Sequence, residues 1–167
     1  MNDMGCHDPK LEMEKLPDPY DNGHWEWHRQ MAFETAYGFI YEVVNMETGQ
    51  RYLGKKNYRH MGKSRRLKST GKQAQMNWRT YTGSSEKLNE DIKEFGMDKF
   101  RFFVIAEYNT KGGLNWGEIW SQTYREIPTR RLPDGERMYY NRVISACKWI
   151  PTEEITQEHK DSIKRLK

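Results

Sequence analysis

The feature that most constrains the fold is the stretch from Gly38 to Lys56, in which two strand-like segments flank a turn-like connection. Residues 37–45 are rich in aromatic and β-branched residues, which favours a β-strand. Residues 45–49 (NMETG) have the composition of a hairpin connection, and residues 51–56 provide the returning strand. The stretch therefore predicts an antiparallel hairpin that carries two tyrosines and ends on two lysines: Tyr41, Tyr52, Lys55 and Lys56.

Local signals after the hairpin predict a helix, a strand and a second helix. Ser84 and Ser85 are good N-cap residues, apolar residues follow at helical spacing, and Gly96 can close the helix. Residues 100–108 (FRFFVIAEY) have the composition of a buried strand, and residues 114–127 carry most of an apolar helical stripe. The strands and helices thus alternate after the hairpin.

The two ends of the chain give weaker signals. We expect a short helix over residues 24–36, which contain Trp25 and Trp27, and a charged surface helix within residues 151–167. Residues 139–150 are expected to pack back on the sheet. Together these elements predict an α+β fold, a small three-stranded, mainly antiparallel sheet flanked by helices.

The predicted organisation has three parts. Residues 1–36 form an acidic, tryptophan-containing N-terminal extension, with eight acidic and three basic residues. Residues 37–150 form the folded domain, with a basic insert at 57–80, and residues 151–167 form a charged tail. The chain has no apolar run of eighteen residues and no signal-peptide pattern, so we expect no membrane association. The two cysteines, Cys6 and Cys147, do not resemble a disulfide framework, which favours a reducing cytoplasm.

A basic stretch stands out against the modest net charge of +4. No acidic residue occurs from Thr48 to Ser85, whereas ten bases do: Arg51, Lys55, Lys56, Arg59, Lys63, Arg65, Arg66, Lys68, Lys72 and Arg79. Such a segment attracts polyanions through counterion release. The structural alternative is a solvated basic loop. Interleaved aromatic residues favour nucleic acid, because aromatic rings stack on bases.

Phosphodiester hydrolysis needs a group that accepts or orients the proton of a water, cations that neutralise the phosphoryl oxygens, and a metal or proton at the leaving oxygen. A tyrosine acts as a base only if its pKa of about 10 is lowered by nearby cations or a metal. Lysine and arginine supply such a field and bind phosphate, and one carboxylate can hold a hydrated Mg²⁺. The hairpin and the basic stretch contain several of these groups.

Phe39-Ile40-Tyr41 and, ten residues later, Tyr52-Leu53-Gly54 resemble the paired signature of the GIY-YIG nuclease family. Downstream, Gly83-Ser84-Ser85, Glu118 and Tyr139-Tyr140-Asn141 are similar to the family's second helix, metal-binding glutamate and closing asparagine motif. The resemblance covers roughly residues 37–145 and is greatest to bacteriophage endonucleases, which share the Gly-Lys-Lys and the Trp-x-x-Tyr-x-Gly-Ser-Ser stretch. One departure is the first half, which reads Phe-Ile-Tyr with its glycine one place earlier.

The resemblance implies a role for each matching residue. Tyr41 would be the general base or position the attacking water, and Tyr52 would bind the phosphate or assist through hydrogen bonding. Lys55 would lower the tyrosine pKa and contact the phosphate, with Lys56 as the substitute. Glu118 would hold a single Mg²⁺ (or Mn²⁺), and Asn141 would brace the site.

The family's arginine is the second departure. It usually has a His or Tyr four residues later, and no arginine here has that partner. We favour Arg79, which Trp78 and Tyr81 can anchor, followed by Arg65 and Arg66, with Arg59 also a candidate. The residues expected to contact DNA are Lys56, Arg59, Lys63, Lys68, Lys72, Trp78 and Tyr81.

Each of these residues also has a structural interpretation. Tyr41 and Tyr52 could be ordinary sheet aromatics, and Glu118 a solvent-facing helix residue. A zinc site is a further alternative, because His24 and His28 would share a helix face, and Cys6 and His7 could complete the ligands.

The sequence thus predicts a metal-dependent endonuclease that acts on double-stranded DNA in the cytoplasm, which is the host cytoplasm if a phage encodes it. One alternative is a nucleic-acid-binding module on the same fold that does not cleave. Another is an enzyme directed at RNA or an accessory protein that binds an acidic partner. The acidic N-terminal extension could mask the basic surface or form a homodimer contact.

Overall fold

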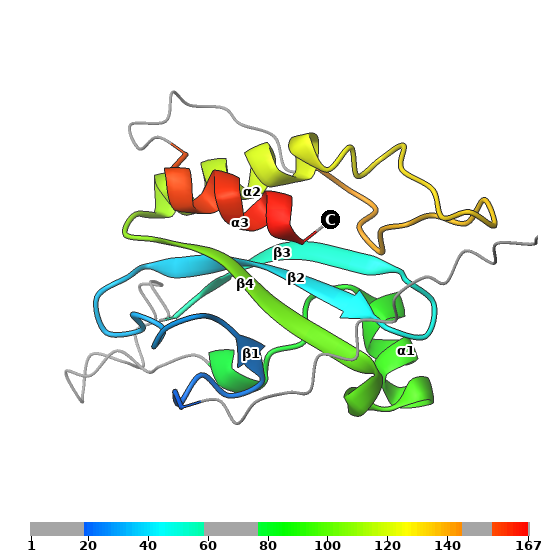
Figure 1. The fold of residues 1–167 in the computed structure, drawn as a ribbon, viewed down its shortest axis with the longest axis horizontal. Helices are drawn as coiled ribbons and strands as arrows, with labels where there is room; N and C mark the ends of the chain where they lie inside the picture. The colour runs from blue at the N-terminus through cyan, green and yellow to red at the C-terminus, as the bar shows by residue number, and fades with distance from the viewer. Residues whose placement is uncertain (1–18, 59–76, 145–154, 167) are drawn as a thin grey trace, which may run out of the picture.

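The computed structural model describes residues 19–58, 77–144 and 155–166. Its sheet has four strands in the order β1-β4-β2-β3: β1 (Trp25–Glu26), β2 (Gly38–Asn45), β3 (Arg51–Asn57) and β4 (Phe100–Tyr108). The helices are α1 (Glu86–Phe95), α2 (Lys111–Tyr124) and α3 (Gln157–Arg165), with short 3-10 turns η2 (Trp78–Thr80) and η3 (Met97–Lys99). The fold is α+β, as predicted (Figure 1).

The sheet is mixed, which corrects the expectation of three mainly antiparallel strands. The hairpin forms as predicted, because β2 and β3 pair antiparallel with Tyr41 opposite Gly54. β4 pairs antiparallel with the other side of β2. The fourth strand is β1, which pairs parallel to β4 at Phe102 and Phe103. Residues 24–36 were expected to form a helix, so the strand at Trp25–Glu26 is also a correction.

The sheet separates two cores, which we name by what covers them. On the aromatic face, Phe39, Tyr41 and Val43 of β2 pack with Trp25, Trp78 and other aromatic rings beside α1. On the helical face, Ile40 and Leu53 pack against apolar residues of α2 and α3. Figure 1 shows α2 and α3 together over one side of the sheet, with α1 and β1 toward the other. Adjacent residues of one strand therefore serve different cores.

A bulge in β4 explains how one strand contributes to both cores. Ile40 pairs with Ala106 and Tyr41 with Val104, so Ile105 is an extra residue in β4. Because side chains alternate along a strand, one extra residue reverses the face of every residue beyond it. Phe102 and Val104 accordingly lie in the aromatic core, whereas Ala106 and Tyr108 lie in the helical core.

The helix ends follow the local capping signals. The Ser85 side chain accepts a hydrogen bond from the backbone of Leu88, and Gly96 closes α1 with a φ of 92°. These are the predicted caps. α2 begins at Lys111 rather than Leu114, because Thr110 caps it by accepting from the Gly113 N–H at 3.0 Å.

The C-terminal helix α3 docks on the helical face through a buried histidine. The two ring nitrogens of His159 lie 2.6 Å from the Tyr108 hydroxyl and 2.6 Å from the Ser121 hydroxyl. Burial lowers the pKa of His159 to about 4, so the ring is neutral near pH 7. No helix in the described residues is both long enough and apolar enough to span a bilayer.

Candidate active site

The two predicted tyrosines lie side by side on the aromatic face, at the edge formed by β3. Tyr41 is buried, and its ring centroid lies 6.0 Å from that of Tyr52. Gly54 makes this arrangement possible. A Cβ at Gly54 would lie 2.7 Å from the Tyr41 hydroxyl and 2.9 Å from the Tyr52 ring, so a side chain there would displace both rings.

A third tyrosine, Tyr81, joins this pair from the segment after η2. Its ring is perpendicular to that of Tyr41, with the two centroids 6.1 Å apart. The Lys56 ammonium lies 3.9 Å from the Tyr81 ring centroid, in cation–π geometry. The sequence assigned Tyr81 to DNA contact and to anchoring Arg79, and Lys56 to DNA contact and as the substitute for Lys55. The structure places Tyr81 beside Tyr41 and Lys56 over the Tyr81 ring.

The segment that leads into α1 holds Tyr52 from the other side. The Tyr52 hydroxyl is 2.9 Å from the Ser84 hydroxyl. Gly83 has a φ of 123°, and a Cβ there would lie 3.2 Å from the Tyr52 ring. The Gly-Ser-Ser stretch thus provides an open surface for the ring, a hydroxyl partner and the helix cap in consecutive residues.

The acidic group of the site comes from the helical face. The Glu118 carboxylate, on α2, accepts a hydrogen bond from the Lys55 ammonium at 2.6 Å. Their side chains are 11% and 30% exposed, so the pair lies at the edge of the core. Gln122 follows Glu118 by one helical turn and lines the same pocket. Lys55 and Glu118 reach the β3 edge opposite the tyrosines.

Asn141 holds this edge in place by completing a strand-like pairing. Its side-chain oxygen accepts from the Leu53 N–H at 3.0 Å, and its amide nitrogen donates to the Leu53 carbonyl at 2.7 Å. Just before it, the backbones of Met138 and Tyr140 bond to Arg51. The Tyr140 hydroxyl donates to Asp91 of α1 at 2.7 Å. The segment therefore ties β3 to α1, and a role of Asn141 in bracing a catalytic site stays a prediction.

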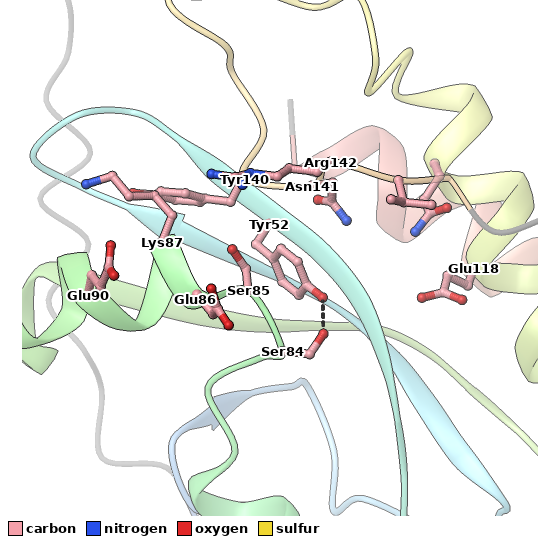
Figure 2. Close-up of a pocket in the computed structure, with 12 residues that line it drawn as sticks. Tyr52, Ser84, Ser85, Glu86, Lys87, Glu90, Glu118, Tyr140, Asn141 and Arg142 are labelled. Atoms are coloured by element: carbon pink, nitrogen blue, oxygen red, sulfur yellow. Dashed lines mark hydrogen bonds between the residues drawn. The ribbon is translucent and has the colours of Figure 1, made fainter.

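A pocket of about 510 Å³ opens beside Tyr52, Glu118 and Asn141. Figure 2 shows Tyr52 at its centre, with Glu118 to one side and Glu86 and Glu90 to the other. Twelve residues line it: Tyr52, Ser84, Ser85, Glu86, Lys87, Glu90, Glu118, Gln122, Tyr140, Asn141, Arg142 and Val143. The pocket thus contains residues from β3, α1, α2 and the segment around Asn141.

The family model described as "Putative endonuclease segE, GIY-YIG domain" matches residues 24–144. This chain belongs to the GIY-YIG family. Its β2–β3 hairpin carries the paired signature, and the matched region contains every residue of the pocket. No curated protein and no solved structure matches the chain.

Five of the residues that the GIY-YIG resemblance named come together in the structure. Tyr41, Tyr52, Lys55, Glu118 and Asn141 lie around Gly54 and the β3 edge, although Tyr41 and Asn141 are 100 residues apart in the sequence. Six others, Arg59, Lys63, Arg65, Arg66, Lys68 and Lys72, lie outside the described residues. Their assignment to DNA binding or catalysis stays a prediction.

Arg79 and Trp78 do not take the places that the sequence suggested. The Arg79 guanidinium bonds to Asp21 at 3.0 Å and lies over the rings of Trp78 and Phe33. It does not line the pocket. Trp78 is fully buried, and its ring packs against Phe33 and other core rings. It therefore has no exposed ring face on which a DNA base could stack. Both corrections follow from contacts with the N-terminal segment.

The pocket contains an arginine that the sequence analysis missed. Arg142 is exposed and lines the pocket directly after Asn141. Figure 2 shows it next to Asn141, above Tyr52. Its position directly after the closing asparagine is the sequence signal that could have identified it. The expectation of an arginine soon after the second tyrosine did not include this position.

Burial changes the chemistry available to Tyr41. It raises the pKa of the Tyr41 phenol well above its usual value, and the neighbouring Tyr52 and Tyr81 add to the effect. The hydroxyl therefore stays protonated near neutral pH in the free protein. In this state Tyr41 can donate and accept hydrogen bonds, but acting as a base requires a lower pKa in the presence of substrate.

Glu118 has the chemistry expected of a Mg²⁺ ligand. Mg²⁺ keeps several waters and is commonly bound through one or two carboxylates together with substrate phosphate. Glu118 offers one carboxylate toward a polar pocket of sufficient volume, and the Gln122 amide lines the same wall. Among the described residues, no three His, Cys, Asp or Glu side chains cluster in a way that could hold an ion without substrate.

The histidines of the zinc alternative take separate partners. His24 bonds through Nε2 to the Tyr81 carbonyl at 3.0 Å, and His28 pairs with Glu158 at 3.3 Å. Cys6 and His7 lie outside the described residues. The described pair therefore packs the N-terminal segment against η2 and α3.

Proposed function

We propose that this protein is a metal-dependent endonuclease that hydrolyses phosphodiester bonds of double-stranded DNA. The observation that carries the proposal is the meeting of Tyr41, Tyr52, Lys55 and Glu118 at the β3 edge. Two strands and a helix supply these groups, and the Asn141 side chain fixes the edge. A sheet that needed only aromatic packing would not require a lysine–glutamate pair beside two tyrosine hydroxyls.

The tyrosines would handle the water and the phosphate oxygens. In hydrolysis the water oxygen bonds to phosphorus and the bond from phosphorus to the leaving oxygen breaks. The water gives up a proton, and the leaving oxygen takes up a proton from solvent. The protonated Tyr41 hydroxyl would orient that water, and its proton would pass to solvent unless bound substrate lowers the Tyr41 pKa. The Tyr52 hydroxyl, fixed by Ser84, would donate to a phosphate oxygen.

Glu118 would hold the divalent cation, Mg²⁺ or Mn²⁺, with Gln122 beside it. A single bound ion supplies charge neutralisation at the phosphate and a lower pKa for a coordinated water. The Lys55 ammonium is paired with the Glu118 carboxylate in the structure, so the metal ion would compete with Lys55 for that carboxylate. Arg142 is the described arginine placed to neutralise charge on the phosphate from the open side of the pocket.

Double-stranded DNA is the proposed substrate because the acid-free basic stretch leads directly from β3 and returns at η2, beside the tyrosines. Binding should weaken steeply with salt, since each neutralised phosphate releases counterions. A flat response of binding to salt would argue against this role for the stretch.

Nicking of supercoiled plasmid tests the proposal. Wild-type protein should convert supercoiled DNA to open-circular or linear forms in Mg²⁺ or Mn²⁺ and not in EDTA. Glu118→Gln keeps the shape of the side chain and removes its charge, so it should bind DNA without cutting. Intact plasmid with both ions, at protein concentrations that shift the DNA on a gel, would refute the enzyme.

That refuting result would support the second candidate, a nucleic-acid-binding module that does not cleave. The observation in its favour is Arg79, which Asp21 holds away from the pocket. The wild-type plasmid assay separates the two candidates. In a protein that cleaves, Arg79→Gln tests which arginine is used, because a nuclease that relies on another arginine should keep its cleavage.

The proposed origin, location and oligomeric state of the protein rest on its sequence. We propose that a phage encodes it, that it acts in the host cytoplasm, and that residues 1–36 contribute to a homodimer contact. Light scattering of the full chain tests the last point, since a monomeric mass at working concentration would exclude a stable dimer.

A further inference from the structure

The two lysines that follow Gly54 are neighbours in sequence but lie in different surroundings. Side chains alternate across a strand, so Lys55 and Lys56 project to opposite faces of β3. Lys55 belongs to the helical face with Glu118, and Lys56 to the aromatic face with Tyr81. The resemblance to known nucleases cannot distinguish these lysines, whereas their contacts can.

Lys55 already has its counter-charge. Its ammonium donates to Glu118 at 2.6 Å, and the carboxylate side chain is only 11% exposed. Because the Glu118 carboxylate balances the charge of Lys55, an incoming phosphate would approach an ion pair with no net charge. To bind the phosphate as a free cation it must first give up a short, partly buried ion pair.

Lys56 has no such partner. Among the described residues it forms no ion pair, and its recorded contact is with the Tyr81 ring, 3.9 Å from the ammonium. The side chain is half-buried, and burial lowers the pKa of Lys56. A desolvated cation without an anion is unfavourable, so an anion that reached it would recover that free energy.

The position of Lys56 specifies where such an anion would lie. The Tyr81 ring that holds the ammonium also packs perpendicular to the Tyr41 ring, with the two centroids 6.1 Å apart. Tyr41 in turn lies 6.0 Å, ring to ring, from Tyr52. An anion on Lys56 would therefore lie on the face of β3 that carries Tyr81, Tyr41 and Tyr52.

We infer that Lys56, held in place by the ring of Tyr81, is the lysine that binds the phosphate to be cleaved, and that Lys55 serves mainly to hold Glu118. Tyr81 is then a positioning residue that acts through its ring. The assignment of Lys56 to the phosphate that is cleaved rests on the proposed function. Its binding component does not depend on cleavage.

The first experiment compares Lys56→Gln with Lys55→Gln in the full chain. Affinity for a fluorescent DNA duplex is measured by anisotropy in EDTA, where no cleavage occurs, and the cleavage rate is then measured in Mg²⁺. We expect Lys56→Gln to weaken binding by about tenfold or more, as for loss of a charge-assisted hydrogen bond, and to slow cleavage further. Lys55→Gln should weaken binding less.

Two results would overturn the inference. One is a Lys56→Gln protein that binds the duplex within about twofold of wild type, which is less than the loss of any direct phosphate contact. The other is a Lys55→Gln protein that loses more affinity than Lys56→Gln. If wild type binds DNA but never cleaves it, the proposed enzyme fails, while the EDTA comparison still decides which lysine binds phosphate.

The role of the Tyr81 ring has its own test. Tyr81→Phe keeps the ring and should retain most of the affinity, whereas Tyr81→Leu should lose it to about the extent of Lys56→Gln. In the Tyr81→Leu background, Lys56→Gln should add little, because the two residues act together. Additive losses, or Phe and Leu variants that bind equally, would contradict the positioning role. Thermal denaturation of each variant shows whether the fold is retained.

Discussion

The helical face and the β3 edge of the aromatic face hold their polar groups in different ways. On the helical face, buried charges are paired within the protein: Glu42 is fully buried and bonds to Arg125 at 3.0 Å, with Arg51 at 3.7 Å and the Tyr139 hydroxyl at 3.2 Å. On the aromatic face, the polar groups at the β3 edge are tyrosine hydroxyls, and the cation beside them has no carboxylate partner among the described residues.

This difference distinguishes charges that stabilise the fold from groups that can bind a ligand. A fully paired buried charge has no capacity left for a ligand, whereas neutral hydroxyls around a single cation can exchange their partners for phosphate oxygens. Glu118 stands between the two cases, because it is paired like the helical face but lies at the edge next to the pocket. The site therefore forms where the two faces meet at Gly54.

The largest predicted effect comes from breaking the buried ion pairs of the helical face. Glu42→Ala leaves two arginines without their carboxylate, and loss of one partner of a buried pair costs about 3–5 kcal/mol of unfolding free energy. Urea denaturation measures it. The matched variant Glu118→Ala removes a carboxylate from the edge and should cost less than Glu42→Ala, because the Lys55 side chain that it leaves unpaired is 30% exposed, while cleavage is lost. Equal destabilisation by the two variants would contradict the contrast between the faces.

A pH effect of similar size comes from His159, which packs against Tyr108, Ser121 and Trp120. Its pKa is about 4 in the folded protein and near 6.5 when unfolded, so the unfolded state binds the proton first as pH falls. Stability should then decrease between about pH 6.5 and 4, by about 3 kcal/mol in total.

His159→Gln, which can keep both hydrogen bonds, provides the control for this titration. Its stability should lack that component of the pH dependence, as measured by denaturant titrations at several pH values. Parallel curves for wild type and His159→Gln would show that the histidine does not contribute.

A smaller effect is expected where the faces meet. Asn141→Leu removes both side-chain bonds to Leu53, and leaving a buried N–H and carbonyl without partners costs about 1–3 kcal/mol. Cleavage should fall by a larger factor than stability suggests, because the β3 edge carries the site. Retained cleavage with normal stability would mean that the strand edge needs no bracing.

Elements with local signals could be predicted from the sequence. The β2–β3 hairpin, the caps of α1 at Ser85 and Gly96, and β4 at Phe100–Tyr108 match their predicted positions. Each depends on residues close in the chain. The family signature added Tyr41, Tyr52 and Glu118, because it encodes which distant positions belong together.

The differences arise from long-range contacts that no local pattern records. Trp25 and Glu26 form a strand only because Phe102 and Phe103 offer a free edge 77 residues away, which overrides any helical periodicity. Arg79 is directed to Asp21, 58 residues before it. The neighbouring Trp78 and Tyr81, which favoured Arg79, contained no information about this partner, and the same limit hid Arg142 and the separate surroundings of Lys55 and Lys56.

Two buried tyrosines on the aromatic face allow the most direct test of the central claim. Tyr41 is assigned to the reaction, whereas Tyr58 is fully buried and donates to Glu107, a contact that only supports the fold. Single-turnover cleavage of a DNA duplex in Mg²⁺, with thermal denaturation alongside, compares Tyr41→Phe with Tyr58→Phe. We predict that Tyr41→Phe slows cleavage by about 100-fold or more with the fold intact, as for loss of a group that handles a proton. Tyr58→Phe should lower stability and still cleave. Cleavage at the wild-type rate by Tyr41→Phe would contradict the account.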